Sequence, residues 1–134
     1  MLTLRSEQIE ALRLALEPSF VDRLFQHVQA AHAAAVAEMG EPAARELVAR
    51  CAAEARRAGL AWEISIADFV SLAFTVAPWF YLQPGIAAAL ASIGASSRPD
   101  HRFFLFGGMV SPADWEDARR NWRAGPDAPP GGTV

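Results

Sequence analysis

The sequence contains no lysine and a single cysteine, and both shortages narrow what the protein can be. Its 134 residues carry 12 arginines against 15 acidic residues, a formal charge of −3. With no excess of positive charge to neutralise phosphates, we do not expect a dedicated nucleic-acid-binding protein. Cys51 alone cannot form an intramolecular disulfide, so the sequence carries no sign of an oxidising compartment.

The N-terminal region also lacks the uninterrupted apolar stretch of a secretory signal peptide. Charged residues recur within it, at Arg5, Glu7, Glu10, Arg13 and Glu17. We therefore expect a cytoplasmic protein. Because 52% of the residues are hydrophobic, the chain is able to bury a core without disulfides or metals, and one folded domain is expected.

The first half of the chain has the composition and the three-and-four spacing of amphipathic helices. Ser6 is predicted to cap a first helix, and Pro18 to kink or restart it. A second helix is predicted from Phe20 to Met39, with Gly40 as its left-handed C-terminal residue. The residues predicted on its inward face are Phe20, Leu24, Val28, Ala31, Ala35 and Met39.

A third helix is predicted between Pro42 and Gly59, because proline suits the first turn of a helix and glycine its end. Its inward residues would be Leu47, Val48, Cys51 and Ala55. Together with the second helix it would form a helical hairpin.

A capping box predicts the next helix. Ser65 would cap it, Asp68 would reach back, and Ile64 would pack on Phe69 as a hydrophobic staple. The helix would run to about Ala77.

The remaining elements are shorter. A helix is predicted from Pro84 to Gly94, and a second capping box at Ser111 would open a last helix that runs to about Trp122. Residues 98–106 fit a helix or an extended segment, and we favour a helix.

These elements predict an all-α fold, a compact bundle of five to six helices formed by one domain over residues 1–123. Residues 124–134 contain several prolines and glycines and no core-sized side chain except Val134. This composition predicts a disordered C-terminal tail.

Residues 69–97 contain no charged side chain, a stretch long enough to span a bilayer. Pro78, Gln83 and Pro84 interrupt it, and each apolar piece is too short to span a bilayer alone. Buried helices of a small bundle have the same composition. We favour that interpretation over membrane insertion or a re-entrant hairpin.

No grouping of residues predicts a catalytic or metal site. His27 and His32 are five residues apart, so a helix turns them away from each other, and His101 has no further ligands at a metal-binding spacing. Cys51 lies on an apolar helix face, where a buried thiol is inert. The sequence has no nucleophile elbow, phosphate loop or dinucleotide fingerprint. We therefore predict that the protein is not an enzyme and binds no cofactor or metal.

Two groups of aromatic and arginine residues are candidates for a protein-binding surface, because such residues are enriched in interface hot spots. The first lies in a connection between helices, where it either covers the core or forms an exposed apolar patch. The second lies on the last helix, where a solvated face explains the charges equally well. The predicted partner-binding residues are Trp79, Phe80, Tyr81, Trp115, Arg119 and Trp122.

A pattern of helix starts and apolar positions recurs within roughly residues 2–95. It is carried by residues 2–12, 20–27, 46–48, 55–60, 66–70 and 77–78. In this pattern the chain resembles a known family of small helical proteins from bacterial type VI secretion clusters. Those proteins are encoded beside effectors, spike proteins and effector adaptors.

The resemblance implies a cytoplasmic accessory protein, a co-chaperone or co-adaptor that binds a secretion effector or its adaptor before loading. An immunity protein that neutralises a cognate toxin has the same composition, and a membrane-associated helical protein using residues 69–97 is a third alternative. We expect a protein partner rather than a nucleic acid or a membrane. The sequence leaves open whether the chain also forms a homodimer through its alanine-rich second helix.

Overall fold

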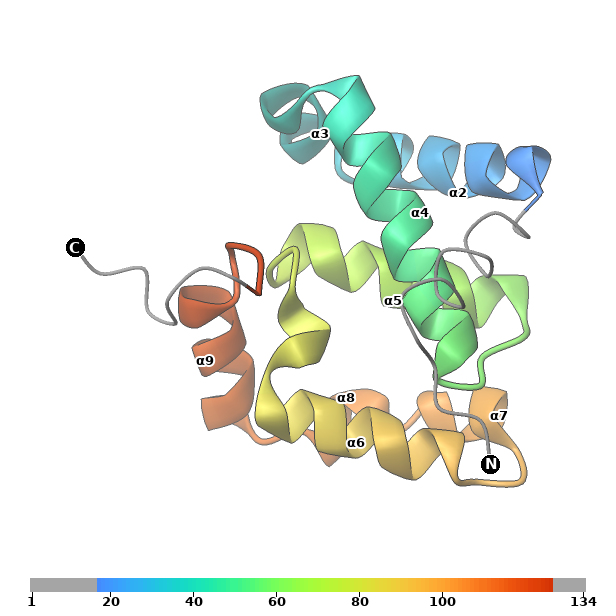
Figure 1. Cartoon of the computed structure of the whole chain (residues 1–134), viewed down its shortest axis with the longest axis vertical. Coiled ribbons are helices and arrows are strands. Elements are labelled where there is room, and N and C mark those ends of the chain that lie inside the picture. The colour runs from blue at the N-terminus through green and yellow to red at the C-terminus, as the bar shows by residue number, and fades with distance from the viewer. Residues whose placement is uncertain (1–16, 127–134) are drawn as a thin grey trace.

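The computed structural model describes residues 17–126, which form eight α-helices and one short 3₁₀ helix without any strand (Figure 1). The elements are α2 (Pro18–Ala31), α3 (Ala33–Met39), α4 (Glu41–Arg57), α5 (Glu63–Thr75), η1 (Phe80–Leu82), α6 (Pro84–Gly94), α7 (Pro99–Phe103), α8 (Phe106–Met109) and α9 (Pro112–Asn121). The predicted all-α class is confirmed. The helix predicted after Ser6 and residues 127–134 of the predicted tail lie outside the described residues.

The second helix is where the structure differs most from the sequence prediction. Pro18 starts α2 as predicted, but the helix is interrupted at His32, whose backbone adopts φ −133° and ψ 47°. The ring of His32 stacks on the ring of Phe74 with the centroids 6.0 Å apart. After the break Val36 is the buried residue, whereas Ala31 is exposed. The predicted single helix with Ala31 on its inward face is therefore wrong: α2 ends at Ala31, and beyond the break at His32 the inward position is taken by Val36.

The third predicted helix is confirmed as α4. Glycines with positive φ stand at both of its ends, Gly40 at 93° and Gly59 at 99°. All of its predicted inward residues are buried: Leu47, Val48, Cys51 and Ala55. The three-and-four spacing of the apolar residues was sufficient to identify this face. In the structure, α4 packs against both α2 and α5.

The capping box predicted at Ser65 is wrong. The N-cap of α5 is Trp62, three residues before Ser65, and Ser65 lies inside the helix with a buried hydroxyl that has no hydrogen-bond partner among the described residues. Ile64 is 61% exposed and forms no staple. The start of α5 is set instead by the buried carboxylate of Asp100, which accepts hydrogen bonds from the amides of Ala61 and Trp62.

The helices predicted from Pro84 and from Ser111 are confirmed as α6 and α9. The Ser111 hydroxyl accepts a hydrogen bond from the amide of Asp114 at 3.1 Å, as the capping box predicted. Residues 98–106 are largely helical, as favoured, but they contribute to two short helices, α7 and α8. Together with the break at His32, this explains why there are more helices than the five to six predicted.

Figure 1 shows how the elements are arranged. Helices α2 and α3 lie above α5 in this view, α4 crosses α5 and reaches toward α6, and α6, α7 and α8 lie below α5 with α9 at the left. The buried side chains form one cluster, in which the largest fully buried members are Phe25, Phe69, Phe80, Leu24, Ile66, Ile86 and Ile93. In the described part of the chain, every helix is too short or too polar to cross a membrane.

Candidate functional site

The aromatic segment predicted to contact a partner is mostly core. Phe80 is fully buried and Tyr81 is 6% exposed, and their rings contact each other and Phe69. Only Trp79 keeps part of its surface in contact with solvent. Phe80 and Tyr81 are therefore corrected from contact residues to core residues, because the sequence could not tell which way this connection packs.

Arg50 of α4 holds this segment in place. Its guanidinium carbon lies 3.6 Å from the centroid of the Trp79 ring. The same group donates hydrogen bonds to the Tyr81 hydroxyl at 3.0 Å and to the Pro78 carbonyl at 2.8 Å. Burial raises the pKa of Tyr81 to about 12, although Arg50 acts in the opposite direction, so this hydroxyl stays neutral at physiological pH.

The three predicted contact residues of the last helix are placed differently from one another. Trp115 is half-buried, with its ring edge-on to Phe106 at 5.7 Å. Trp122 ends α9, and its carbonyl accepts a hydrogen bond from the amide of Trp79. Arg119 is exposed. With Trp79, these residues remain a predicted contact surface, although all three tryptophans are partly buried against the core.

A second aromatic surface is more exposed than the predicted one. Phe104 is 64% exposed, Leu105 60% and Trp62 42%. The Trp62 ring meets the His101 ring edge-on at 4.7 Å and lies 6.5 Å from the Phe104 ring. We call Trp62, His101, Phe104 and Leu105 the aromatic patch. Exposed apolar groups that gather in this way mark interaction surfaces more often than single exposed residues do.

Two contacts hold the aromatic patch against the core. Asp100, at the start of α7, accepts hydrogen bonds from the amides of Ala61 at 3.1 Å and of Trp62 at 2.9 Å. Phe103 and Phe106 turn inward and stack on each other at 5.2 Å. The two residues between them are left on the outside, so the exposure of Phe104 and Leu105 follows from the burial of their neighbours.

Sequence reasoning did not identify the aromatic patch. Residues 103–106 read Phe-Phe-Leu-Phe, and no spacing within four consecutive apolar residues tells the inner pair from the outer pair. Trp62 is 39 positions from His101 and 42 from Phe104, counted along the sequence. The sequence offered one indication of this surface, Asp100, which looked like the first residue of a helix. In the structure its carboxylate binds the backbone amides that precede α5.

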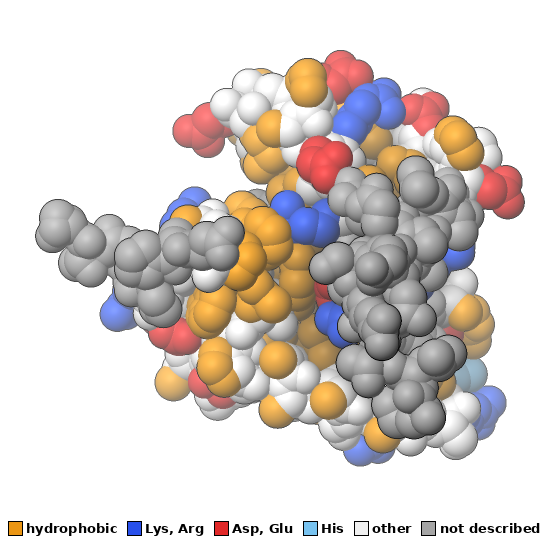
Figure 2. Space-filling model, in the orientation of Figure 1, with side chains coloured by type: hydrophobic (Ala, Val, Ile, Leu, Met, Phe, Trp, Pro, Cys, Tyr) orange, Lys and Arg blue, Asp and Glu red, His pale blue; other side chains and the backbone are white. Residues whose placement is uncertain are grey.

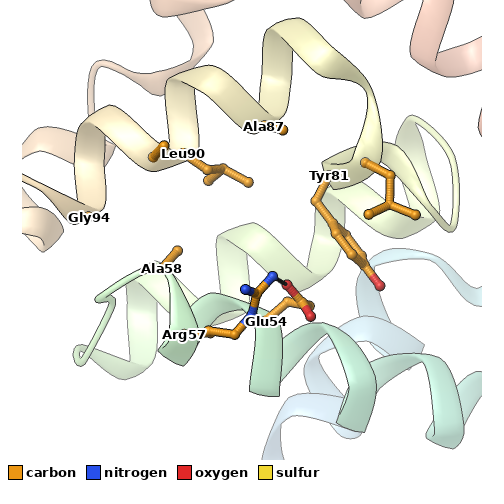
Figure 3. Close-up of a pocket in the computed structure, with 9 residues that line it drawn as sticks. Glu54, Arg57, Ala58, Tyr81, Ala87, Leu90 and Gly94 are labelled. Carbon is orange, nitrogen blue, oxygen red and sulfur yellow. Dashed lines mark hydrogen bonds and ion pairs between the residues drawn. The ribbon is translucent and has the colours of Figure 1, made fainter. Parts of the chain in front are cut away.

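The structure also contains a pocket of about 410 Å³ between α4 and α6. Figure 3 shows Glu54, Arg57 and Ala58 on one wall, Ala87, Leu90 and Gly94 on the other, and Tyr81 beside them. On the same face of the molecule, Figure 2 shows hydrophobic side chains gathered over the connection between α5 and α6.

The polar groups of this pocket are already paired. Arg57 and Glu54 form an ion pair at 2.6 Å, and the Tyr81 hydroxyl accepts its hydrogen bond from Arg50. The lining offers no nucleophile beside a base, because the nearby Cys51 is fully buried and burial raises its thiol pKa to about 12. The pocket is therefore a groove between α4 and α6 whose polar side chains already have partners.

Metal-binding side chains are dispersed in the described residues, where no three of His, Cys, Asp or Glu come close enough to share an ion. His32 packs on Phe74, and His101 packs on Trp62. Comparison of the chain with models of protein families, with curated proteins and with solved structures found no match. The function of the protein is therefore inferred from its surfaces and its sequence.

Proposed function

We propose that the protein is a non-enzymatic binding module that docks onto a partner protein through the aromatic patch. One observation carries this proposal: Phe104 and Leu105 are exposed by more than half, whereas the other large apolar side chains of residues 17–126, Ile64 and Trp62 apart, pack into one core. A few side chains supply most of the binding energy of a protein interface, and aromatic residues, phenylalanine among them, are enriched in interfaces.

The architecture around the aromatic patch supports the same role. Asp100 ties the α4–α5 connection to α7, so Trp62 is held in place before a partner arrives. A contact surface that is ordered in the free protein loses little conformational entropy on binding. The patch therefore needs little reordering when a partner binds.

The partner class comes from the sequence resemblance. It implies a cytoplasmic co-chaperone or co-adaptor, and the partner would then be a type VI secretion effector or its adaptor. Binding would occur before the effector is loaded.

The test is co-expression with each product of the neighbouring genes, followed by affinity purification and measurement of Kd for any complex. Replacing Phe104 and Leu105 by serine should weaken binding by about 2 kcal/mol or more, roughly thirtyfold in Kd. Because both side chains are exposed, folding stability should change by no more than about 0.5 kcal/mol per substitution. Circular dichroism checks that helicity is retained.

Two comparisons sharpen this test. The double variant Trp115→Ala, Trp122→Ala examines the surface predicted from the sequence, and loss of binding there with Phe104 and Leu105 unimportant would reject the aromatic patch. Co-expression with a neighbouring toxin separates the immunity alternative, since only an immunity protein would protect the cells. A partner bound equally well by the Phe104→Ser, Leu105→Ser variant would contradict the proposal.

A further inference from the structure

Two exposed arginines border the aromatic patch. Arg98 precedes α7 and Arg102 lies within it. The amide of Arg102 donates to the Arg98 carbonyl at 3.0 Å, and the amide of Leu105 donates to the Arg102 carbonyl at 2.9 Å. These three residues therefore follow one another on successive turns of one face. Leu105 belongs to the aromatic patch, so this shared face places both positive charges beside the patch.

The side chains of Arg98 and Arg102 are unusual in having no partner among residues 17–126. Every other arginine in that range makes a side-chain hydrogen bond, an ion pair or a contact with an aromatic ring: Arg23, Arg45, Arg50, Arg56, Arg57, Arg119, Arg120 and Arg123. Two cations that have no partner within this described range thus lie beside the exposed aromatic surface, although the net charge of the chain is −3.

The carboxylates nearest to the aromatic patch in the chain are already engaged. Glu63, which follows Trp62, forms an ion pair with Arg23 at 3.0 Å. Asp100 accepts hydrogen bonds from two backbone amides. The patch and its border therefore present apolar surface together with positive charge.

We propose that the aromatic patch binds an amphipathic segment of the partner in which apolar residues are flanked by aspartate or glutamate, an inference that rests on the proposed function. Apolar anchors of the partner pack on Phe104 and Leu105, and its carboxylates pair with Arg98 and Arg102. The planar guanidinium group suits this role because it can give a carboxylate two parallel hydrogen bonds. Complementary charges at the rim mainly select the partner and speed its association, while the apolar anchors supply affinity.

An anionic membrane is the other surface that attracts exposed aromatics beside arginines. It extends far beyond the patch, so it also meets the acidic remainder of the molecule, which it repels. A short segment pairs only with the groups that it touches. The net charge of −3 therefore favours the segment over the membrane.

The experiment uses two fluorescent peptides with leucine and tryptophan at the same helical spacing and either glutamate or lysine at the remaining positions. Fluorescence anisotropy gives Kd at about 0.05 M and about 0.3 M salt. The glutamate peptide should bind about tenfold more tightly at low salt, and the difference should shrink at high salt. The variant Arg98→Glu, Arg102→Glu should reverse the preference. A control with the same charge change at the C-terminal end of α9 and just beyond it, Arg120→Glu with Arg123→Glu, should keep it.

Each other outcome overturns the inference. Equal binding of both peptides, or a reversal by the α9 control, would show that the two arginines do not select the partner. Binding to vesicles of phosphatidylserine and phosphatidylcholine with neither peptide bound would identify a membrane surface instead. If neither peptide binds while Phe104→Ser with Leu105→Ser still abolishes co-purification, the inference fails and the proposed function stands. If co-purification persists in that variant, the proposed function fails.

Discussion

The guanidinium group of Arg50 lies over the ring of Trp79, with its central carbon 3.6 Å from the ring centroid. Its nitrogens donate to Tyr81 and Pro78 at the same time. One side chain of α4 thereby holds three positions of the connection between α5 and α6. This is why a segment that reads as an aromatic contact surface is mainly a part of the core.

Tyr81 is the only tyrosine in the chain, so its ionisation can be followed by tyrosinate absorbance without interference from others. Burial raises its pKa to about 12, and the native protein should titrate near that value, against about 10 for the protein unfolded in guanidinium. Because the folded pKa lies above the unfolded one, the stability contributed by neutral Tyr81 is present below about pH 10 and is lost as the pH rises toward 12. A native midpoint near 10 would show that the hydroxyl is solvated.

Cys51 should be unreactive in the folded protein. It is fully buried, and burial raises its thiol pKa to about 12, so almost no thiolate is available at neutral pH. We expect Ellman's reagent to label the native protein only as fast as it opens, and to label it immediately in urea. Rapid labelling without denaturant would mean that α4 does not pack as described.

Asp100 should stabilise both the fold and the aromatic patch. Asp100→Ala leaves the amides of Ala61 and Trp62 without their acceptor, which should cost about 1–3 kcal/mol in the free energy of unfolding measured with urea. Asp68→Ala is a matched control, because that carboxylate is exposed, and it should change stability by less than about 0.5 kcal/mol. Equal urea midpoints for the two variants would show that Asp100 does not stabilise the fold through these amides.

Gly85 should be intolerant of a side chain for a reason that lies on another helix. A Cβ atom placed there would come within 2.0 Å of the Asp114 carboxylate, which accepts a hydrogen bond from the buried Gln83 at 3.0 Å. Gly85→Ala should therefore destabilise the protein by about 1–3 kcal/mol, since Asp114 must move and its hydrogen bond is lost.

A double-mutant cycle tests the cause. In the Asp114→Ala background, Gly85→Ala should be neutral or slightly stabilising, because alanine is favoured over glycine in a helix once the clash is gone. Additive costs of the two substitutions, measured by urea unfolding, would show that the clash is not what makes Gly85 necessary.

Two serines show how far a local pattern can predict this fold. Ser65 and Ser111 both stand three residues before an aspartate, yet only Ser111 caps a helix. The start of α9 is set by a hydrogen bond within its own first turn, from the Asp114 amide to the Ser111 hydroxyl. The start of α5 is decided by Asp100, 38 positions beyond Trp62, and a motif within one turn contains no information about such a contact.

The all-helical class and the inward face of α4 follow from composition and spacing, because helix propensity and amphipathic periodicity are local properties of a chain. Which aromatic side chains meet solvent is not a local property. Phe103 and Phe106 are buried while Phe104 and Leu105 are exposed, and the Trp79 segment is held inward by Arg50, 29 positions earlier. Only packing between segments distant in the chain could decide these orientations, since each depends on the partner that the folded structure brings to it.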